Sequence, residues 1–362
     1  MTTSFGSILG RFYGRAAAAR RASFDSHPER RRQLSKPVIS IGNLVAGGSG
    51  KTPIVAYVAS MLAREGERPA VLSRGYGRRQ RERGVVVVSD GTRITADIDR
   101  AGDEPLMLAR TLEGDASAGV FVAADRHAAG QLAESKYGAT VHVLDDGFQH
   151  LRLKRDVDLV VVTPRDLEEE TLLPEGRLRE PRETIKRADA LLVSGVSLIE
   201  ARALAAKWGV PKAFTVIRTP AVPRMVEPYG TAPRVPRSSP VVAVAGIARP
   251  ERFLDDLTAS GWTIADALIF RDHHRFDRGD VSRIARRVRE TGASLVLTTE
   301  KDVMRLMSWR PLAFPLAWVP LAVGVEPADD FRLWLRWRLS GATEDKPRSV
   351  EGRPRSSAEG RP

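Results

Sequence analysis

The chain has 362 residues, a hydrophobic content of 42% and a formal net charge of +12. It is therefore long enough for two folded domains and basic enough to favour an anionic partner. It contains no cysteine, which excludes disulfides, thiolate metal sites and cysteine nucleophiles. All its apolar runs are shorter than a membrane span, so we expect no transmembrane helix.

The first thirty residues predict a basic amphipathic helix. Apolar side chains recur at helical spacing between Phe5 and Tyr13, with arginines around them and no acidic residue before Asp25. Such a helix can lie in the headgroup layer of an anionic membrane or pack its apolar stripe on the protein's own core. An arginine-rich organelle transit peptide is a third interpretation. The segment alone leaves all three open.

A glycine-rich loop follows the first predicted strand. The strand covers 38–41, the loop ends in Gly50-Lys51-Thr52, and an apolar-periodic helix follows at once. This order is typical of a phosphate-binding loop (P-loop), where backbone N–H groups and a lysine surround phosphate oxygens and a hydroxyl ligates Mg²⁺. Val45 replaces the usual first glycine, so an ordinary glycine-rich turn is the alternative. We predict that a nucleotide binds at Gly47, Gly48, Ser49, Gly50, Lys51 and Thr52.

Three further polar side chains lie in loops next to predicted elements. Tyr76 stands among glycines and arginines after the strand over 69–73, which suits either a ligand-facing loop or a solvated basic turn. Asp103 opens a predicted helix, either as its N-cap or as an exposed catalytic carboxylate. Arg126 follows the strand over 120–123, where a cation is placed to hold an anion.

An apolar strand over 141–144 ends in two adjacent aspartates, Asp145 and Asp146. Downstream of a P-loop, an acidic strand end is typical of the site that organises Mg²⁺. Two neighbouring carboxylates at a buried strand end repel each other unless a cation lies between them. A polar turn that closes the strand is the alternative. We predict that Thr52, Asp145 and Asp146 hold Mg²⁺.

The predicted fold class is α/β, with a P-loop-containing nucleotide-binding lobe on a mostly parallel sheet and a second, smaller α/β lobe. We expect the amphipathic helix over 1–30 and the P-loop core over 31–220. Prolines and arginines dominate 221–240, which predicts a linker or hinge. The smaller lobe follows over 241–340. The segment 341–362 is rich in Pro, Gly, Ser and charge, so we expect it to be disordered.

Paired histidines, His273 and His274, follow Asp272 in the smaller lobe. They suggest either a metal site or an acid–base histidine, and no further histidine cluster supports the metal.

Eight short motifs occur in a characteristic order along the chain. They are Gly42-Asn43 through Gly47-Gly48-Ser49-Gly50-Lys51-Thr52-Pro53, Ser73-Arg74-Gly75-Tyr76, Gly102-Asp103-Glu104-Pro105, Asp125-Arg126, Asp145-Asp146-Gly147-Phe148-Gln149-His150, Leu178-Arg179-Glu180-Pro181, Asp272-His273-His274 and Thr299-Glu300-Lys301-Asp302. Each motif alone is weak, but their joint order resembles the tetraacyldisaccharide 4'-kinase family. The resemblance covers the chain from the N-terminal helix to about residue 335.

The resemblance implies transfer of the γ-phosphate of ATP to the 4'-hydroxyl of a tetraacylated glucosamine disaccharide 1-phosphate, a step of lipid A synthesis, with Mg²⁺ as cofactor. It implies a peripheral protein on the cytoplasmic face of the bacterial inner membrane, with residues 1–30 on the anionic surface. Another P-loop ATPase or small-molecule kinase is the alternative. We expect no nucleic-acid partner, because no basic stripe with interleaved aromatic residues occurs.

The resemblance also implies roles for individual residues. Asp103 is the base that takes the hydroxyl proton, with support from His273 rather than His274. Lys51 and Arg126 stabilise the transferring phosphoryl group. The substrate-site residues implied are Tyr76, Gln149, Arg179 and Glu180.

Overall fold

Runs of buried β-branched residues form the central sheets of the protein, whose computed structural model describes residues 5–47, 50–80, 82–114 and 118–344. Within these residues the larger sheet has nine strands, parallel except for the two edge strands β14 and β3. Strands such as β1 are buried along their whole length, as strands covered on both faces require. In spatial order the strands are β14 (Leu321–Glu326), β8 (Ala213–Pro220), β7 (Ala190–Ser194), β6 (Val157–Val162), β1 (Val38–Gly42), β5 (Val141–Asp145), β2 (Pro69–Ser73), β4 (Gly119–Val122) and β3 (Val86–Ser89).

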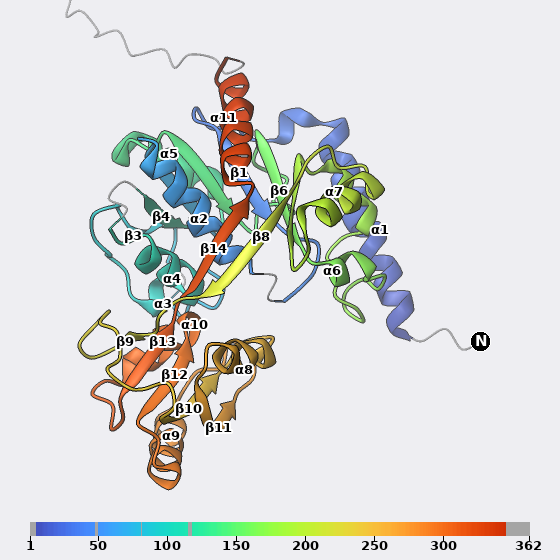
Figure 1. Ribbon diagram of the computed structural model, residues 1–362. Helices are drawn as coiled ribbons and strands as arrows, with labels where there is room; N and C mark the ends of the chain where they lie inside the picture. Colours follow the sequence, from blue (N-terminus) through green and yellow to red (C-terminus); the bar gives the residue numbers. More distant parts are fainter. Residues whose placement is uncertain (1–4, 48–49, 81, 115–117, 345–362) are drawn as a thin grey trace, which may run out of the picture.

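Helices cover both faces of this sheet (Figure 1). One face packs against α2 (Lys51–Arg64), α3 (Ile98–Ala101), α4 (Asp103–Thr111) and α11 (Ala328–Glu344). The other face packs against α5 (Arg126–Tyr137), α6 (Pro164–Glu168) and α7 (Leu198–Lys207). Short 3₁₀ turns lie at Pro28–Arg30 and Arg182–Arg187. The predicted α/β class with a mostly parallel sheet is confirmed.

The smaller lobe is a second α/β layer. Its sheet is parallel apart from the short strand β9, and it runs in the order β11 (Thr263–Ile269), β10 (Pro240–Ala245), β12 (Leu295–Thr299), β13 (Leu316–Val319) and β9 (Arg224–Met225). Helix α8 (Pro250–Ala259) packs on one face, while α9 (Arg278–Thr291) and α10 (Glu300–Leu306) pack on the other. A 3₁₀ turn follows α10 at Met307–Trp309.

The chain crosses between the lobes twice. It leaves the larger sheet through β8 and returns to it through β14, which pairs with β8 in antiparallel register. The two strands run side by side along the neck between the lobes (Figure 1). The prediction that the smaller lobe extends to residue 340 is therefore wrong, because β14 and α11 belong to the larger lobe.

The flanking segments also differ from their predicted boundaries. The predicted linker over 221–240 contributes β9 to the smaller sheet. The predicted tail over 341–362 begins inside α11, which continues to Glu344, and its remainder lies outside the described residues.

Helix α1 (Phe5–Ser26) lies along the outside of the larger lobe (Figure 1). It docks through small residues, because Gly10 and Gly14 lie against the backbone and side chain of Leu172. Arg21 anchors its far end through a buried ion pair with Glu180, at 2.6 Å between Nη2 and Oε2. In the described part of the chain, no helix is both long and apolar enough to span a bilayer.

The apolar stripe predicted for this helix faces outward where it is described. Phe12 is 65% exposed and Tyr13 is 39% exposed, whereas the glycines face the protein. Packing of this stripe on the protein's own core is thus contradicted for these two residues.

Candidate active site

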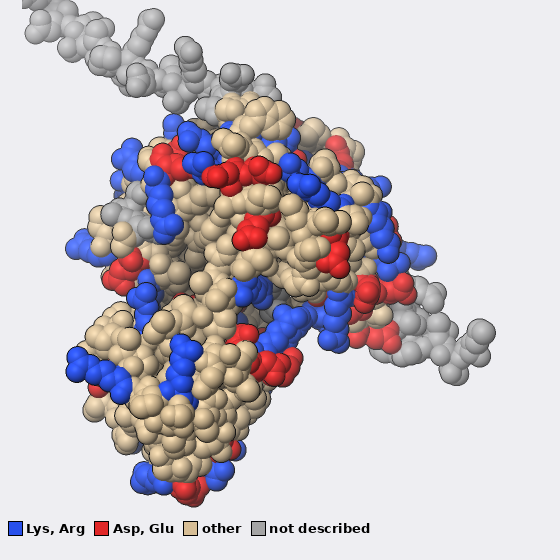
Figure 2. Space-filling model, viewed as in Figure 1, with Lys and Arg blue, Asp and Glu red and all other residues tan. Residues whose placement is uncertain are grey.

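A cleft of about 1950 Å³ separates the two lobes beside the neck. Loops after β1, β5 and β7 of the larger sheet form one wall, and loops after β10, β11 and β12 of the smaller sheet form the other. Ligands bind at the carboxyl ends of parallel strands in open α/β sheets, and these loops lie there. Figure 2 shows the recess between the lobes with Lys and Arg side chains at its rim.

The P-loop lies where it is predicted, between β1 and α2. β1 ends at Gly42, where an added Cβ would lie 2.4 Å from Phe148 Cβ, so a larger residue does not fit. Gly50 adopts a φ of +72° and is the N-cap of α2, whose first residues Lys51 and Thr52 line the cleft. Gly47, Gly50, Lys51 and Thr52 line the cleft, and the predicted ligands Gly48 and Ser49 lie outside the described residues.

Two oxygen acceptors hold the Lys51 ammonium at the cleft. Its Nζ donates to Asn43 Oδ1 at 2.8 Å and lies 3.2 Å from Asp146 Oδ1. Asn43 is buried and donates in turn to the Val45 carbonyl at 2.6 Å, which fixes the loop. Asn43 is a site residue that sequence reasoning missed, although it stands in the first motif.

The two aspartates after β5 have opposite electrostatic environments. Asp145 is buried, and this burial together with the nearby charges of Glu104 and Asp146 raises its pKa to about 7. Its Oδ2 accepts a hydrogen bond from Ser73 Oγ at 3.0 Å. Asp146 pairs with Lys51 and Arg179; burial alone would raise its pKa, but these two cations outweigh burial and lower it to about 2.

This pair fits the predicted magnesium site. Carboxylate and hydroxyl oxygens are the ligands that Mg²⁺ prefers, and Thr52 lines the same cleft as Asp145 and Asp146. Asp146 has a φ of +52°, a strained conformation that is concentrated at functional sites. Across the described ranges no three His, Cys, Asp or Glu side chains gather into a metal cage. A cation here would therefore complete its shell with phosphate oxygens, as Mg²⁺ does in kinases.

Arg126 is the first residue of α5 and lines the same cleft. Burial and the neighbouring charge of Arg74 lower its pKa to about 10, whereas Asp145 and Asp146 act in the opposite direction. Its Nη1 donates to the Ala124 carbonyl at 3.2 Å, while its buried Nε has no hydrogen-bond acceptor among the described residues. A buried guanidinium with an unused donor is suited to bind a phosphate oxygen.

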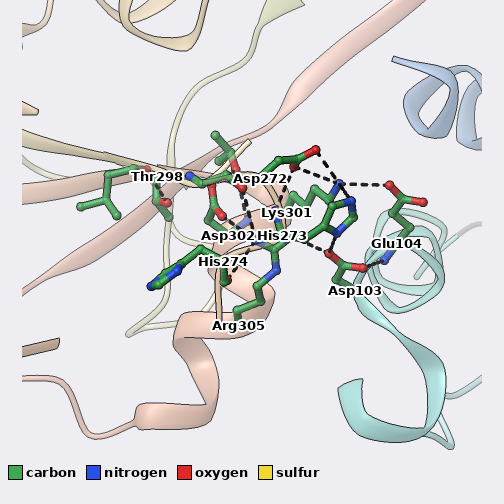
Figure 3. A network of polar contacts seen from close by, with 12 residues as sticks. Asp103, Glu104, Asp272, His273, His274, Thr298, Lys301, Asp302 and Arg305 are labelled. Carbon is green, nitrogen blue, oxygen red and sulfur yellow. Dashed lines mark hydrogen bonds and ion pairs between the residues drawn. The ribbon is translucent and has the colours of Figure 1, made fainter. Parts of the chain in front are cut away.

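The predicted acid–base pair joins the two lobes, with Asp103 in the larger lobe and His273 in the smaller one (Figure 3). Asp103 is the first residue of α4, with Gly102 rather than Asp103 as the N-cap. Asp103 Oδ2 accepts from His273 Nδ1 at 3.0 Å, across the interface between the lobes. The His273 ring faces the cleft and is 33% exposed, whereas the Asp103 side chain lies behind it and is 8% exposed.

The second nitrogen of His273 contacts a lysine (Figure 3). Lys301 Nζ lies 3.1 Å from His273 Nε2 and 3.1 Å from Glu104 Oε1. Because an ammonium can only donate, Nε2 accepts and the ring proton is assigned to Nδ1, facing Asp103. His274 turns away, with its Nε2 2.7 Å from Asp280 Oδ2.

The geometry also reveals an arginine group that sequence reasoning missed. Arg218 of β8 lies against Gly50 of the P-loop, and Arg249 and Arg252 of the smaller lobe line the same part of the cleft. Burial together with Arg252 and Arg249 lowers the pKa of Arg218. The abundance of arginine throughout the chain hides this group in the sequence.

Of the four predicted substrate residues, three have side chains placed near the catalytic groups, whereas the fourth, Glu180, pairs with the N-terminal helix. Tyr76 is 70% exposed and lies edge-on to the His273 ring, at 5.6 Å between ring centroids. Gln149 lines the cleft and donates to the Asn43 carbonyl at 2.9 Å. Arg179 contacts Asp146, but the carboxylate of Glu180 is held by Arg21 of α1.

Comparison with known proteins identifies the family. A family sequence model described as tetraacyldisaccharide-1-P 4'-kinase (LpxK) matches residues 3–340. The chain belongs to the tetraacyldisaccharide 4'-kinase family. The predicted family is thus confirmed, and the order of motifs is what carried it.

Individual relatives agree with this family assignment. A tetraacyldisaccharide 4'-kinase from Koribacter versatilis is 37% identical over 89% of this chain and 94% of its own length. The tetraacyldisaccharide 4'-kinase from Syntrophus aciditrophicus is 34% identical over 90% of each chain. Among solved structures, LpxK from Aquifex aeolicus, described as an "apo" form in complex with ATP, shares 27% identity with a TM-score of 0.73 and covers 92% of this chain and 98% of its own.

Proposed function

We infer that the protein is an ATP-dependent kinase that phosphorylates the 4'-hydroxyl of tetraacyldisaccharide 1-phosphate in lipid A synthesis. Family membership supports this activity. The observation that carries it structurally is that His273, hydrogen-bonded to Asp103, lines the same cleft as Lys51 and the paired aspartates. A phosphoryl donor site and a proton acceptor thus share one cleft.

The larger lobe supplies the groups for the nucleotide phosphates. Lys51 and the first N–H groups of α2 bind the β- and γ-phosphates of ATP. Thr52, Asp145 and Asp146 would hold Mg²⁺, which when bound would offset the negative charge of the phosphates. The ammonium of Lys51 then exchanges its contact with Asp146 for phosphate oxygens. Arg126 stabilises the charge on the phosphoryl group during transfer.

The smaller lobe supplies the proton acceptor. The resemblance implies Asp103 as the base, but the covered position of Asp103 favours His273 Nε2 as the atom that takes the hydroxyl proton. Asp103 then orients the ring and stabilises the imidazolium that forms. The hydroxyl replaces Lys301 at Nε2, while Glu104 keeps the ammonium close.

We propose that the protein works as a peripheral protein on the cytoplasmic face of the inner membrane. Exposed Phe12 and Tyr13 on α1, next to exposed Arg15 and Arg20, support contact with anionic lipids. The cytoplasmic face follows from the use of ATP as phosphoryl donor. The pair of Arg21 and Glu180 joins this helix to the segment whose Arg179 holds Asp146, and Tyr13 and Arg20 of the helix line the same cleft as Asp146.

The activity is tested by incubating purified protein with Mg²⁺-ATP and the acylated disaccharide 1-phosphate in detergent micelles. Mass spectrometry should detect a product heavier by one phosphate. Lys51→Ala and Asp103→Ala should each lower its rate by at least about 100-fold. ATP hydrolysis that ignores the lipid would instead indicate the alternative P-loop ATPase.

Membrane contact is tested separately by sedimentation with phosphatidylglycerol-containing vesicles. Replacing both Phe12 and Tyr13 with Ser should weaken binding at least about tenfold, because each aromatic side chain buries apolar area worth about 1.5–3 kcal/mol. Ile199→Ser on α7 is the matched control, since Ile199 is 81% exposed but lies on another helix. Equal binding by all three proteins would contradict the proposal.

A further inference from the structure

One guanidinium joins the two lobes directly behind the acid–base pair (Figure 3). Arg305 belongs to α10 of the smaller lobe, and its Nη2 donates to Oδ2 of Asp103 in the larger lobe. Both side chains are buried, with 6% and 8% of their surface exposed. Asp103 Oδ2 therefore accepts hydrogen bonds from both His273 Nδ1 and Arg305 Nη2, while Oδ1 accepts one from the Glu104 backbone N–H at 3.0 Å.

The smaller lobe holds this guanidinium in a fixed orientation. Arg305 Nη1 lies 3.0 Å from Asp302 Oδ1 and 3.3 Å from the carbonyl of Gly246 at the end of β10. Asp302 is fully buried, and its Oδ2 accepts from Gly246 N at 2.9 Å and from Thr299 Oγ1 at 2.7 Å. Arg305 therefore has little freedom to reorient relative to its own lobe.

The same guanidinium also holds the loop that carries His273. Arg305 Nη1 contacts the carbonyl of His274 at 3.3 Å. His273 itself has a φ of +57°, a conformation that persists only where the surroundings hold it. Arg305 thus contacts the Asp103 carboxylate through Nη2 and the backbone next to His273 through Nη1.

We propose that Arg305 is a positioning residue that aligns the Asp103–His273 pair across the interface between the lobes. The inference rests on the proposed function, because it assigns the pair to proton transfer. Burial alone would raise the pKa of Asp103, but His273, Lys301 and Arg305 outweigh it and hold that pKa well below its usual range. Removing Arg305 leaves the buried carboxylate with weaker partners and frees the histidine loop. A displacement of about 1 Å in such a pair can lower the rate about 100-fold.

A second arginine offers a matched control. Arg275 lies in the same loop region of the smaller lobe, and its Nη2 donates to the Gly77 carbonyl of the larger lobe at 2.9 Å. It therefore joins the same two lobes without contacting Asp103 or His273. A role limited to holding the lobes together should affect Arg275 and Arg305 variants alike.

The experiment measures steady-state phosphorylation of the lipid by wild type, Arg305→Met, Arg305→Lys and Arg275→Gln. We expect Arg305→Met to lower kcat about 100-fold with the KM for ATP within about threefold of wild type, because the P-loop is untouched. Arg305→Lys should restore part of the lost kcat by returning one charged donor. Arg275→Gln should stay within about threefold of wild type.

A double-mutant cycle separates positioning from general stability. Because Arg305 acts by aligning the Asp103–His273 pair, its effect should be lost once the pair is disabled, so adding Arg305→Met to Asp103→Asn should lower kcat by less than about threefold further. A full additional 100-fold loss, or a kcat of Arg305→Met within threefold of wild type, would overturn the inference. If circular dichroism shows that Arg305→Met is unfolded, the cycle is carried out with Arg305→Lys. A kcat of Arg305→Lys equal to that of wild type would then also overturn the inference. A wild type that phosphorylates no lipid refutes the proposed function instead.

Discussion

The buried carboxyl of Asp145 should give the stability of the metal-free protein a specific dependence on pH. Its pKa is raised from 3.8 to about 7 on folding, first because it is buried and then because Glu104 and Asp146 lie nearby. The folded state thus binds a proton more tightly than the unfolded state does. The stability from this proton is fully present below pH 3.8 and is lost as the pH rises through 7. The shift in pKa corresponds to about 4 kcal/mol of unfolding free energy, of which about 2.5 kcal/mol is lost between pH 5 and pH 8.

Asp145→Asn removes this titration while keeping the side-chain size and an acceptor for Ser73 Oγ. Urea unfolding in EDTA at pH 5 and pH 8 should show that wild type loses about 2.5 kcal/mol relative to the variant over this interval. At pH 8 the Asp145→Asn variant should be the more stable protein. Adding Mg²⁺ should then raise the stability of wild type alone. A stability difference between the two proteins that is the same at both pH values would refute the reasoning.

Three further predictions address the loop, the N-terminal helix and the phosphate site. Gly42→Ala should lower the free energy of unfolding by several kcal/mol, because the added Cβ would lie 2.4 Å from Phe148 Cβ; an unchanged melting temperature would contradict this. Arg21→Met should expose α1 to trypsin by leaving Glu180 buried without its cation, and a digestion pattern like that of wild type would count against it. Arg126→Ala should lower kcat about 10- to 100-fold at an unchanged melting temperature, and steady-state kinetics with an unaltered kcat would exclude its role in transfer.

Local features of the sequence located the P-loop and the paired aspartates, which the structure brings to one cleft. The P-loop needs a strand, glycines, a lysine and a helix in immediate succession, so its chemistry is visible within one short stretch around Lys51. Asp145 and Asp146 were visible for a similar reason, since an apolar strand leads directly into them. Parallel pairing of β1 with β5 then brings the two stretches together, with Ile41 opposite Asp145.

Contacts between distant segments could not be predicted in this way. Asp103 and Arg305 are 202 residues apart, and nothing in the spacing of either motif requires them to meet. The return of β14 to β8 is equally hidden, because an edge strand of mixed exposure can pair with either sheet.

The N-terminal helix shows another limit of sequence periodicity. Hydrophobic periodicity finds the stripe that includes Phe12, but small residues dock the helix instead, through Gly10 and Gly14. Glycine carries no hydrophobic signal, and the anchoring Arg21 reads as a surface charge until its buried partner Glu180 is known. Periodicity therefore located the helix but left open which of its faces contacts the protein, and the structure shows that the glycine face does.

The most direct test of the central claim is the destination of the γ-phosphate. Purified protein would receive ATP labelled with ³²P at the γ-position and either the tetraacyldisaccharide 1-phosphate or its 4'-deoxy analogue, and label in the lipid fraction would be measured. A 4'-kinase activity predicts labelled lipid only when the 4'-hydroxyl is present. Equal labelling of the two lipids, or label released only as inorganic phosphate, would contradict it.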